Sequence, residues 1–189
     1  MYRFLILFLI SSIFFGIAYA NVEKVPAQAL RFSFQSADGM VTSKDLRGQV
    51  VLLYFGYTNC PDACPTTLQQ WTRAFNKLAP DEVKRVKGLM VSVDPERDSV
   101  HRLKAFVNFF HKNIIGVTET PENLRNITQQ FGTTFKIQKH ERGKGYSVDH
   151  SFQVYLIDAD GMLRTQVDFT LAVDDLVKLL RERLTFTPP

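Results

Sequence analysis

The residues of this sequence best suited to chemistry are two cysteines, Cys60 and Cys64, in the segment YTNCPDACPTT. They are the only cysteines among 189 residues, and a proline follows each of them. Two thiols this close together can form a disulfide, exchange with the disulfide of another protein, or bind a soft metal ion as thiolates. The cysteine segment by itself leaves all three open.

The prolines bear on the reactivity of these thiols. A residue that precedes proline is driven away from helical backbone angles, so we expect neither cysteine to lie inside a regular helix. Proline is favoured at the first position of a helix, which predicts that a helix begins at Pro65 and that Cys64 is its N-cap. Free N–H groups and the positive end of the helix dipole would then favour the thiolate form of Cys64.

Buried strands and amphipathic helices alternate along the first half of the chain. A continuous apolar run at residues 50–57 is typical of a strand buried on both faces, and residues 86–93 are expected to form another buried strand. Residues 30–35 alternate in polarity as a half-buried strand does, before a turn at Asp38-Gly39. The other expected elements are helices at residues 65–79, 98–111 and 121–131, a short strand at 114–118, a hairpin of residues 150–158 and 161–168, and a closing helix with apolar positions from Val173 to Leu184.

This order of elements predicts an α/β three-layer sandwich. A buried strand that leads directly into a cysteine loop and a helix is the plan of thioredoxin-like domains. We therefore expect a thioredoxin-like fold, with a central mixed sheet and helices on both faces. The sequence contains no repeat, low-complexity tract or long linker, so residues 21–189 are expected to form one compact domain.

The first 20 residues have the pattern of a secretory signal peptide: one positive charge at Arg3, an apolar run, and an A-x-A cleavage site that ends at Ala20. We expect cleavage before Asn21 and export to a bacterial periplasm, where neighbouring thiols pair unless something keeps them reduced. An uncleaved membrane anchor is the alternative, because the largely apolar run of 17 residues from Phe4 to Ala20 reaches the short limit for a spanning helix.

The charge balance excludes some classes of partner. The formal net charge is +4, and loss of Arg3 with the signal peptide leaves +3. That excess is too small to indicate binding to nucleic acid. A mature chain of this length can bury a sizeable core, and we expect a monomer.

A metal site would need a further ligand, and imidazole combines with thiolate in copper, zinc and iron sites. We expect His101 on a helix surface, His111 in a structural place at the C-terminal end of that helix, and His140 solvated in a polar basic loop. His150 opens a predicted strand, and in a thioredoxin-like sheet the start of that strand lies beside the N-terminus of the helix after the cysteine loop. The residues alone leave His150 either a ligand or a packed bystander.

Four segments, in order, resemble the SCO/SenC family of thioredoxin-like copper-binding assembly proteins: DLRGQVVLLYFGYTNCPDACPTTL, VSVDPERDS, TPENLRNITQQFG and VDHSFQVYLIDADG. The resemblance covers about residues 28–184, and the C-P-D-x-C-P loop with a distant D-H-S is its most specific feature. It implies that Cys60, Cys64 and His150 hold a copper ion, as Cu(I) or Cu(II). It also implies delivery of copper to the dinuclear copper centre of cytochrome c oxidase during its assembly, or reduction of that centre's thiols.

The partners that this resemblance implies are a membrane oxidase subunit that accepts copper, or another periplasmic copper protein, together with a periplasmic thiol reductant. A copper chaperone is not an enzyme, although thiol-disulfide reductase activity would fit the same cysteines. Many family members are held at the membrane, and release of this one would make other periplasmic acceptors more plausible. For Asp94 and Asp98, in the segment DPERD, we expect a turn residue and a helix N-cap rather than ligands.

Two alternatives remain for Cys60 and Cys64. The first is a thiol-disulfide oxidoreductase or thiol peroxidase. The segment CPTT resembles the CPT of peroxiredoxins, but those carry Thr or Ser where this chain has Pro61, and the cis-proline of thioredoxin-type oxidoreductases has no counterpart between Glu122 and Phe186. The second is an inert disulfide, whose short loop would stabilise the fold only toward the low end of ~2–4 kcal/mol.

Overall fold

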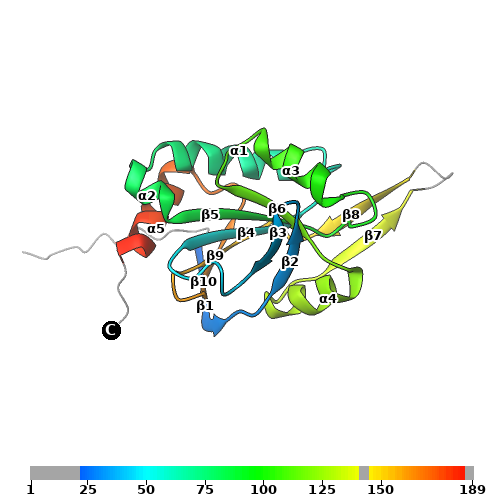
Figure 1. Cartoon of the computed structure of the whole chain (residues 1–189), viewed down its shortest axis with the longest axis horizontal. Coiled ribbons are helices and arrows are strands. Elements are labelled where there is room, and N and C mark those ends of the chain that lie inside the picture. The colour runs from blue at the N-terminus through cyan, green and yellow to red at the C-terminus, as the bar shows by residue number, and fades with distance from the viewer. Residues whose placement is uncertain (1–21, 141–144, 186–189) are drawn as a thin grey trace, which may run out of the picture.

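The computed structural model describes residues 22–140 and 145–185. The predicted signal peptide, its cleavage site and residues 141–144 of the basic loop lie outside the described residues. Within the described part, a mixed eight-stranded sheet carries helices on both faces, and a two-stranded sheet projects at one end (Figure 1). The predicted α/β sandwich of thioredoxin-like type is confirmed.

The main sheet has the strand order β1-β10-β9-β4-β5-β6-β2-β3. Its strands are β1 (Val22–Ala29), β2 (Ser33–Ser36), β3 (Gly39–Thr42), β4 (Val50–Gly56), β5 (Val86–Ser92), β6 (Ile114–Thr118), β9 (Gln153–Ile157) and β10 (Met162–Asp168). The second sheet pairs β7 (Phe135–Lys139) with β8 (Tyr146–His150). The helices are α1 (Ala63–Asn76), α2 (Pro80–Lys84), α3 (Val100–Asn108), α4 (Pro121–Gln130) and α5 (Val173–Thr185).

Strand β4 lies near the middle of the sheet, between β9 and β5, and all seven of its residues are buried. Leu52 and Tyr54 face a core built with side chains of α1, α3 and α5, among them Trp71. Leu53 and Phe55 face a second core, to which α4 contributes. The apolar run at residues 50–57 is therefore a strand buried on both faces, as predicted, and it delivers the chain directly to the cysteine loop.

One predicted strand, at residues 150–158, is wrong at its first positions. β8 ends at His150 and β9 begins at Gln153, so His150 closes one strand instead of opening the next. β8 pairs with β7, which occupies part of the segment expected to be a polar loop. The signal for β7 was the alternation of Phe135 and Ile137 with polar residues, a pattern that spans only five positions.

Strand β1 and the short helix α2 have no counterpart among the predicted elements. β1 is an edge strand that pairs with β10, and its register shifts between Lys24 and Gln28. Pro26 lies within that shift. Proline cannot donate a hydrogen bond to a strand ladder and is tolerated only at edges and bulges. A proline in a segment therefore counts against predicting a strand there, which is why β1 was not expected.

Candidate metal centre

A buried carboxylate anchors the loop that leads from β4 to Cys60. Asp98 accepts hydrogen bonds from the Thr58 backbone N–H, at 2.8 Å, and from the Thr58 hydroxyl. Ser92, the last residue of β5, donates its hydroxyl to the same carboxylate at 2.7 Å. Asp98 thus joins the end of β5 to the backbone two residues before Cys60, which fixes the path of the loop.

The prediction that Asp98 is the N-cap of a helix is wrong. Ser99 caps α3 by accepting a hydrogen bond from the Arg102 backbone N–H at 3.3 Å. Aspartate and serine are both favoured N-cap residues, and they stand side by side here, so only the fold assigns one to the cap and the other to the cysteine loop. Asp94 lies in the expected turn, where its carbonyl accepts the Asp98 N–H at 2.9 Å.

Helix α1 begins at Ala63, so the predicted start at Pro65 is wrong and Cys64 lies inside the helix. Asp62 occupies the N-cap position, and its carbonyl accepts the Thr66 N–H at 3.1 Å. The first four N–H groups of a helix have no partner within it, so a proline in the first turn costs no helical hydrogen bond. This leaves room for the helix to begin two residues earlier than expected.

The two sulfur atoms differ in their exposure. Cys64 is fully buried, and its thiol lies 4.0 Å from the hydroxyl of Tyr54. Gly56 permits this position, because a Cβ at that residue would lie 2.7 Å from the Cys64 Sγ. Cys60 is half-buried, and both cysteines are free thiols.

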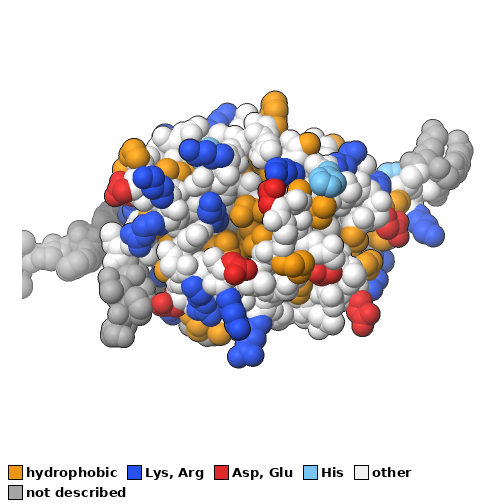
Figure 2. Space-filling model, in the orientation of Figure 1, with side chains coloured by type: hydrophobic (Ala, Val, Ile, Leu, Met, Phe, Trp, Pro, Cys, Tyr) orange, Lys and Arg blue, Asp and Glu red, His pale blue; other side chains and the backbone are white. Residues whose placement is uncertain are grey.

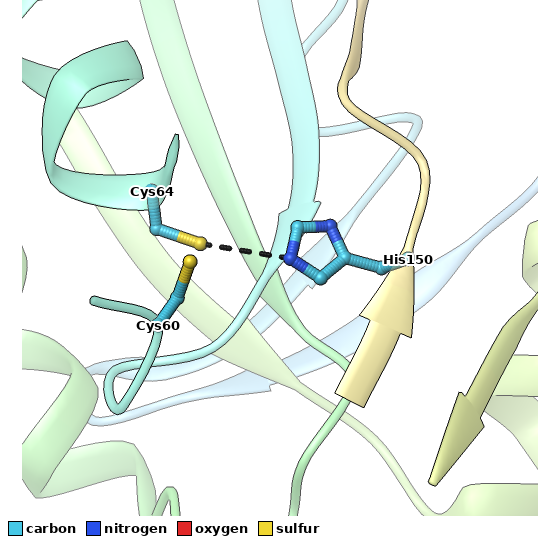
Figure 3. A group of neighbouring side chains, drawn as sticks. All are labelled: Cys60, Cys64 and His150. Carbon is cyan, nitrogen blue, oxygen red and sulfur yellow. Dashed lines mark hydrogen bonds between the residues drawn. The ribbon is translucent and has the colours of Figure 1, made fainter. Parts of the chain in front are cut away.

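His150 faces both cysteines from the end of β8 (Figure 3). Its Nε2 lies 3.9 Å from the Cys64 Sγ, and its Nδ1 lies 2.9 Å from the carbonyl oxygen of Ser151. Because a carbonyl oxygen only accepts, Nδ1 of the neutral ring carries the proton and Nε2 directs its lone pair toward the sulfurs. Tyr54 and Tyr57 contact the imidazole edge to face, each with ring centroids 5.7 Å away.

The ligand atoms of Cys60, Cys64 and His150 all lie within 4.8 Å of one another. Bonds of about 2.0–2.3 Å to nitrogen and sulfur place two ligands of one ion at most about 4.6 Å apart. The three side chains would therefore need only a small contraction to share an ion. Two thiolates and one imidazole form a soft donor set, which suits copper or zinc and favours Cu(I) when few ligands are present.

A hydrogen bond between the two thiols shifts their pKa values in opposite directions. The Cys64 thiol donates to Cys60, and this contact lowers the pKa of Cys60 to about 4 against the opposing effect of burial. The same contact, together with burial, raises the pKa of Cys64 well above its ordinary value. The helix N-terminus was expected to favour the thiolate form of Cys64, but burial and the contact with Cys60 outweigh that effect, so the thiolate is favoured at the half-buried Cys60 instead.

This division predicts the alkylation behaviour of the reduced protein. Cys60 should react with iodoacetamide at a rate that stays nearly constant between pH 6 and pH 8, because the whole range lies above its pKa of about 4. An ordinary thiol with a pKa of about 8.5 would slow roughly tenfold for each pH unit below that value. Mass spectrometry of the digested protein should find the label on Cys60. A rate that falls steeply toward pH 6, or a label mainly on Cys64, would contradict the assignment.

Two of the other histidines lie where the sequence places them, whereas His111 lies beyond the end of α3, which stops at Asn108. His101 and His140 are exposed. His111 is structural: its Nδ1 accepts the Asn113 N–H at 3.0 Å, and its ring packs edge to face against Phe75. Burial, with nearby lysines, lowers the pKa of His111.

A cavity of about 480 Å³ opens beside Cys60 and His150. Its walls include the apolar side chains of Pro61, Phe152 and Phe169, and Phe152 is half exposed although it packs against the imidazole of His150. The half-buried Cys60 lines this cavity, whereas Cys64 is enclosed in the core. Sequence reasoning did not identify these apolar walls, because their residues come from three separate segments.

Comparison with known proteins places this arrangement in a family. The SCO1/SenC family profile matches residues 22–185. The mouse mitochondrial protein named SCO2 homolog is 31% identical over 141 residues, which make up 74% of this chain and 55% of the mouse protein. The chain thus spans little more than half the length of that relative.

Two solved structures show the same similarity in three dimensions. Bradyrhizobium japonicum ScoI with copper bound is 27% identical, with a TM-score of 0.75, over 82% of this chain and 99% of that one. BsSco, described as having a disulfide switch and as a member of the Sco family of cytochrome c oxidase assembly proteins, is 25% identical, with a TM-score of 0.68, over 87% and 98% of the two chains.

This chain belongs to the SCO1/SenC family. The resemblance found in the cysteine loop and the D-H-S segment is therefore confirmed, and with it the thioredoxin-like fold. In residues 22–140 and 145–185, no helix combines the length and the apolar character needed to cross a bilayer.

Proposed function

We propose that this protein binds one copper ion through Cys60, Cys64 and His150 and supplies it to the dinuclear copper centre of cytochrome c oxidase during assembly of that enzyme. The observation that carries the proposal is the convergence of two sulfurs and one imidazole nitrogen within 4.8 Å from distant parts of the chain. Family membership, the copper-bound relative ScoI and the oxidase assembly family of BsSco support the choice of cargo and acceptor.

The site is suited to giving the ion away as well as holding it. The pKa of Cys60 is lowered and its sulfur is open to the cavity, so a partner's thiolate could approach an ion held beside it. Cys64, from the core, and His150, from β8, would be the other two ligands of the ion. Transfer would proceed by exchange of one ligand at a time, with the half-buried sulfur exchanging first because it is the accessible one.

Thiol exchange is the second candidate function, and the lowered pKa of Cys60 favours it. The Cys60 thiolate would attack a disulfide of the partner and release one partner thiolate, forming a mixed disulfide. The Cys64 sulfur, once it has lost its proton, would then displace the second partner thiolate. The partner gains two electrons as a dithiol, Cys60 and Cys64 become a disulfide, and a separate thiol reductant must restore them.

The place of action that we propose is the bacterial periplasm, reached by cleavage of residues 1–20 and leaving residues 21–189 as the copper-binding domain. An uncleaved N-terminal anchor would place the same domain at the membrane surface beside an oxidase. Either arrangement puts the thiols in an oxidising compartment, where a reductant or the metal must keep them from pairing.

An anaerobic titration tests this function. The reduced protein should take up one equivalent of Cu(I) in competition with a colorimetric chelator, and the protein oxidised to the Cys60–Cys64 disulfide should take up none. Insulin reduction should be slow. Brisk insulin reduction without copper uptake would replace the chaperone with the oxidoreductase, and a deletion strain whose oxidase activity is restored by added copper would support delivery.

A further inference from the structure

Strand β8, which carries His150, is not part of the main sheet. Its strand partner within the described residues is β7 alone, so side chains must hold it against the domain. Val148, in the middle of β8, is buried in the core, and Tyr146, at its first position, contacts the loop after β5. Tyr146 lies four residues before His150, which corresponds to about 13 Å along a strand.

The contacts around Tyr146 form a closed group with Asp94 and Arg97, here called the clamp. The Tyr146 hydroxyl donates to Asp94 Oδ1 at 2.7 Å, and Arg97 Nε donates to Oδ2 of the same carboxylate. Arg97 Nη1 donates to the Tyr146 carbonyl oxygen at 2.8 Å. The guanidinium carbon also lies 3.6 Å from the centroid of the Tyr146 ring. Arg97 therefore holds Tyr146 by both its backbone and its ring.

Burial strengthens the contacts of the clamp and raises the cost of removing one of its residues. The Asp94 side chain is 1% exposed and that of Arg97 26%. Hydrogen bonds between ionised groups are stronger than neutral ones, and removal of one partner leaves a buried charge without compensation. The clamp is thus a rigid attachment point rather than a pair of solvated surface residues.

The clamp and the cysteine loop share one anchor. The Ser92 hydroxyl accepts the Asp94 N–H at 3.1 Å and donates to Asp98, which fixes the loop before Cys60. The end of β5 therefore positions the cysteines through Asp98 and the histidine strand through Asp94. Ser92 thus contacts both Asp98, which holds the cysteine loop, and Asp94, which holds β8. Few residues therefore separate the attachment of the imidazole from the attachment of the sulfurs.

Arg97 has a second path to the imidazole. Its guanidinium lies over the ring of Tyr57, 5.6 Å from the centroid, and the Tyr57 ring packs edge to face against His150. Tyr57 is 5% exposed, so it fills the space between the cation and the histidine. Loss of the guanidinium would loosen the support behind this ring as well as the attachment of β8.

We propose that the Asp94–Arg97–Tyr146 clamp is the positioning device that keeps His150 within bonding reach of the two sulfurs. The inference rests on the proposed copper site, and none of the three residues needs to touch the ion. Thiolates satisfy Cu(I), whereas Cu(II) draws on the imidazole nitrogen. Loosening the clamp should therefore weaken binding of Cu(II) and leave binding of Cu(I) nearly unchanged.

Two variants test the clamp. Tyr146→Phe removes the contacts of the hydroxyl with Asp94 and, at 3.4 Å, with Glu96 and keeps the ring, and Arg97→Gln removes the cation. The Cu(II) affinity should fall about tenfold in the first and about tenfold to a hundredfold in the second, the range seen when groups that orient metal ligands are lost. Nitrogen hyperfine splitting in the Cu(II) electron paramagnetic resonance spectrum should weaken, and Cu(I) affinity should stay within about threefold of the parent.

A readout without metal separates this inference from the proposed function. Hydrogen exchange of the β8 amides in the copper-free protein should quicken about tenfold in both variants, because local opening becomes easier. The matched control is Arg164→Gln, which breaks a pair with Asp158 of similar burial, 28% and 3% exposed, away from the cysteines. It should leave β8 exchange and the Cu(II) spectrum unchanged.

Unchanged β8 exchange and an unchanged Cu(II) spectrum in Tyr146→Phe and Arg97→Gln would overturn the clamp, and so would equal effects in Arg164→Gln. If Arg97→Gln fails to fold, the Tyr146→Phe measurements decide. A parent protein that binds no copper would refute the proposed function, and the exchange measurement would still judge whether the clamp holds β8.

Discussion

The Cys64→Ser variant should bind Cu(I) at least about a thousandfold more weakly than the parent protein, a loss of about 4 kcal/mol. The serine hydroxyl does not ionise near neutral pH, and its oxygen is a hard donor where Cu(I) selects thiolate. The fold should survive, because the new hydroxyl would face the hydroxyl of Tyr54, which already lies 4.0 Å from the Cys64 sulfur. Competition with a Cu(I) chelator measures the change.

Variants of the other two proposed ligands and of an exposed histidine provide the comparison for Cys64→Ser. Cys60→Ser should lose a similar amount, since it removes the thiolate that is open to the cavity. His150→Ala should cost Cu(I) about tenfold or less, while the sulfur-to-copper charge-transfer band of the Cu(II) form weakens strongly. The exposed His101 supplies the matched control, because His101→Ala should bind as the parent does. Tight Cu(I) binding by Cys64→Ser would remove that sulfur from the site.

Gly56→Ala should damage the site from within the core. A Cβ at Gly56 would lie 2.7 Å from the Cys64 Sγ and 3.0 Å from a ring carbon of Tyr54, so the sulfur or the ring must move. Overpacking of this kind costs about 1–3 kcal/mol of the free energy of unfolding. We also expect copper affinity to fall at least about tenfold, because the displaced atom is a proposed ligand.

Gly88→Ala is the control for that experiment. Gly88 lies opposite Leu52 on the neighbouring strand β5, and a Cβ there would lie 2.7 Å from the Trp71 ring instead of a sulfur. Thermal unfolding should show a comparable loss of stability in the two variants, whereas only Gly56→Ala should lose copper affinity. Equal copper affinities in the two variants would show that the Cys64 sulfur tolerates displacement.

Local sequence signals were sufficient for most of the framework. The apolar runs that became β4 and β5 and the apolar stripe of α1 are long and strongly patterned, so burial on both faces of the sheet and the order of layers follow from them. The five residues of β7 and the edge strand β1 are short or interrupted, and their pairing depends on partners far along the chain. Such strands acquire their identity from tertiary contacts rather than from propensity.

The sequence by itself determined the chemistry of the site: two thiols beside prolines after a buried strand, and a family resemblance that singles out His150. Only the tertiary structure decided which role each residue in and around the site has. Cys60 carries the anion because Cys64 is buried and donates to it, and Asp98 serves the loop while Ser99 caps the helix. Burial and hydrogen-bond partners arise from chain segments brought together by folding, and a linear pattern does not record which of two similar residues receives them.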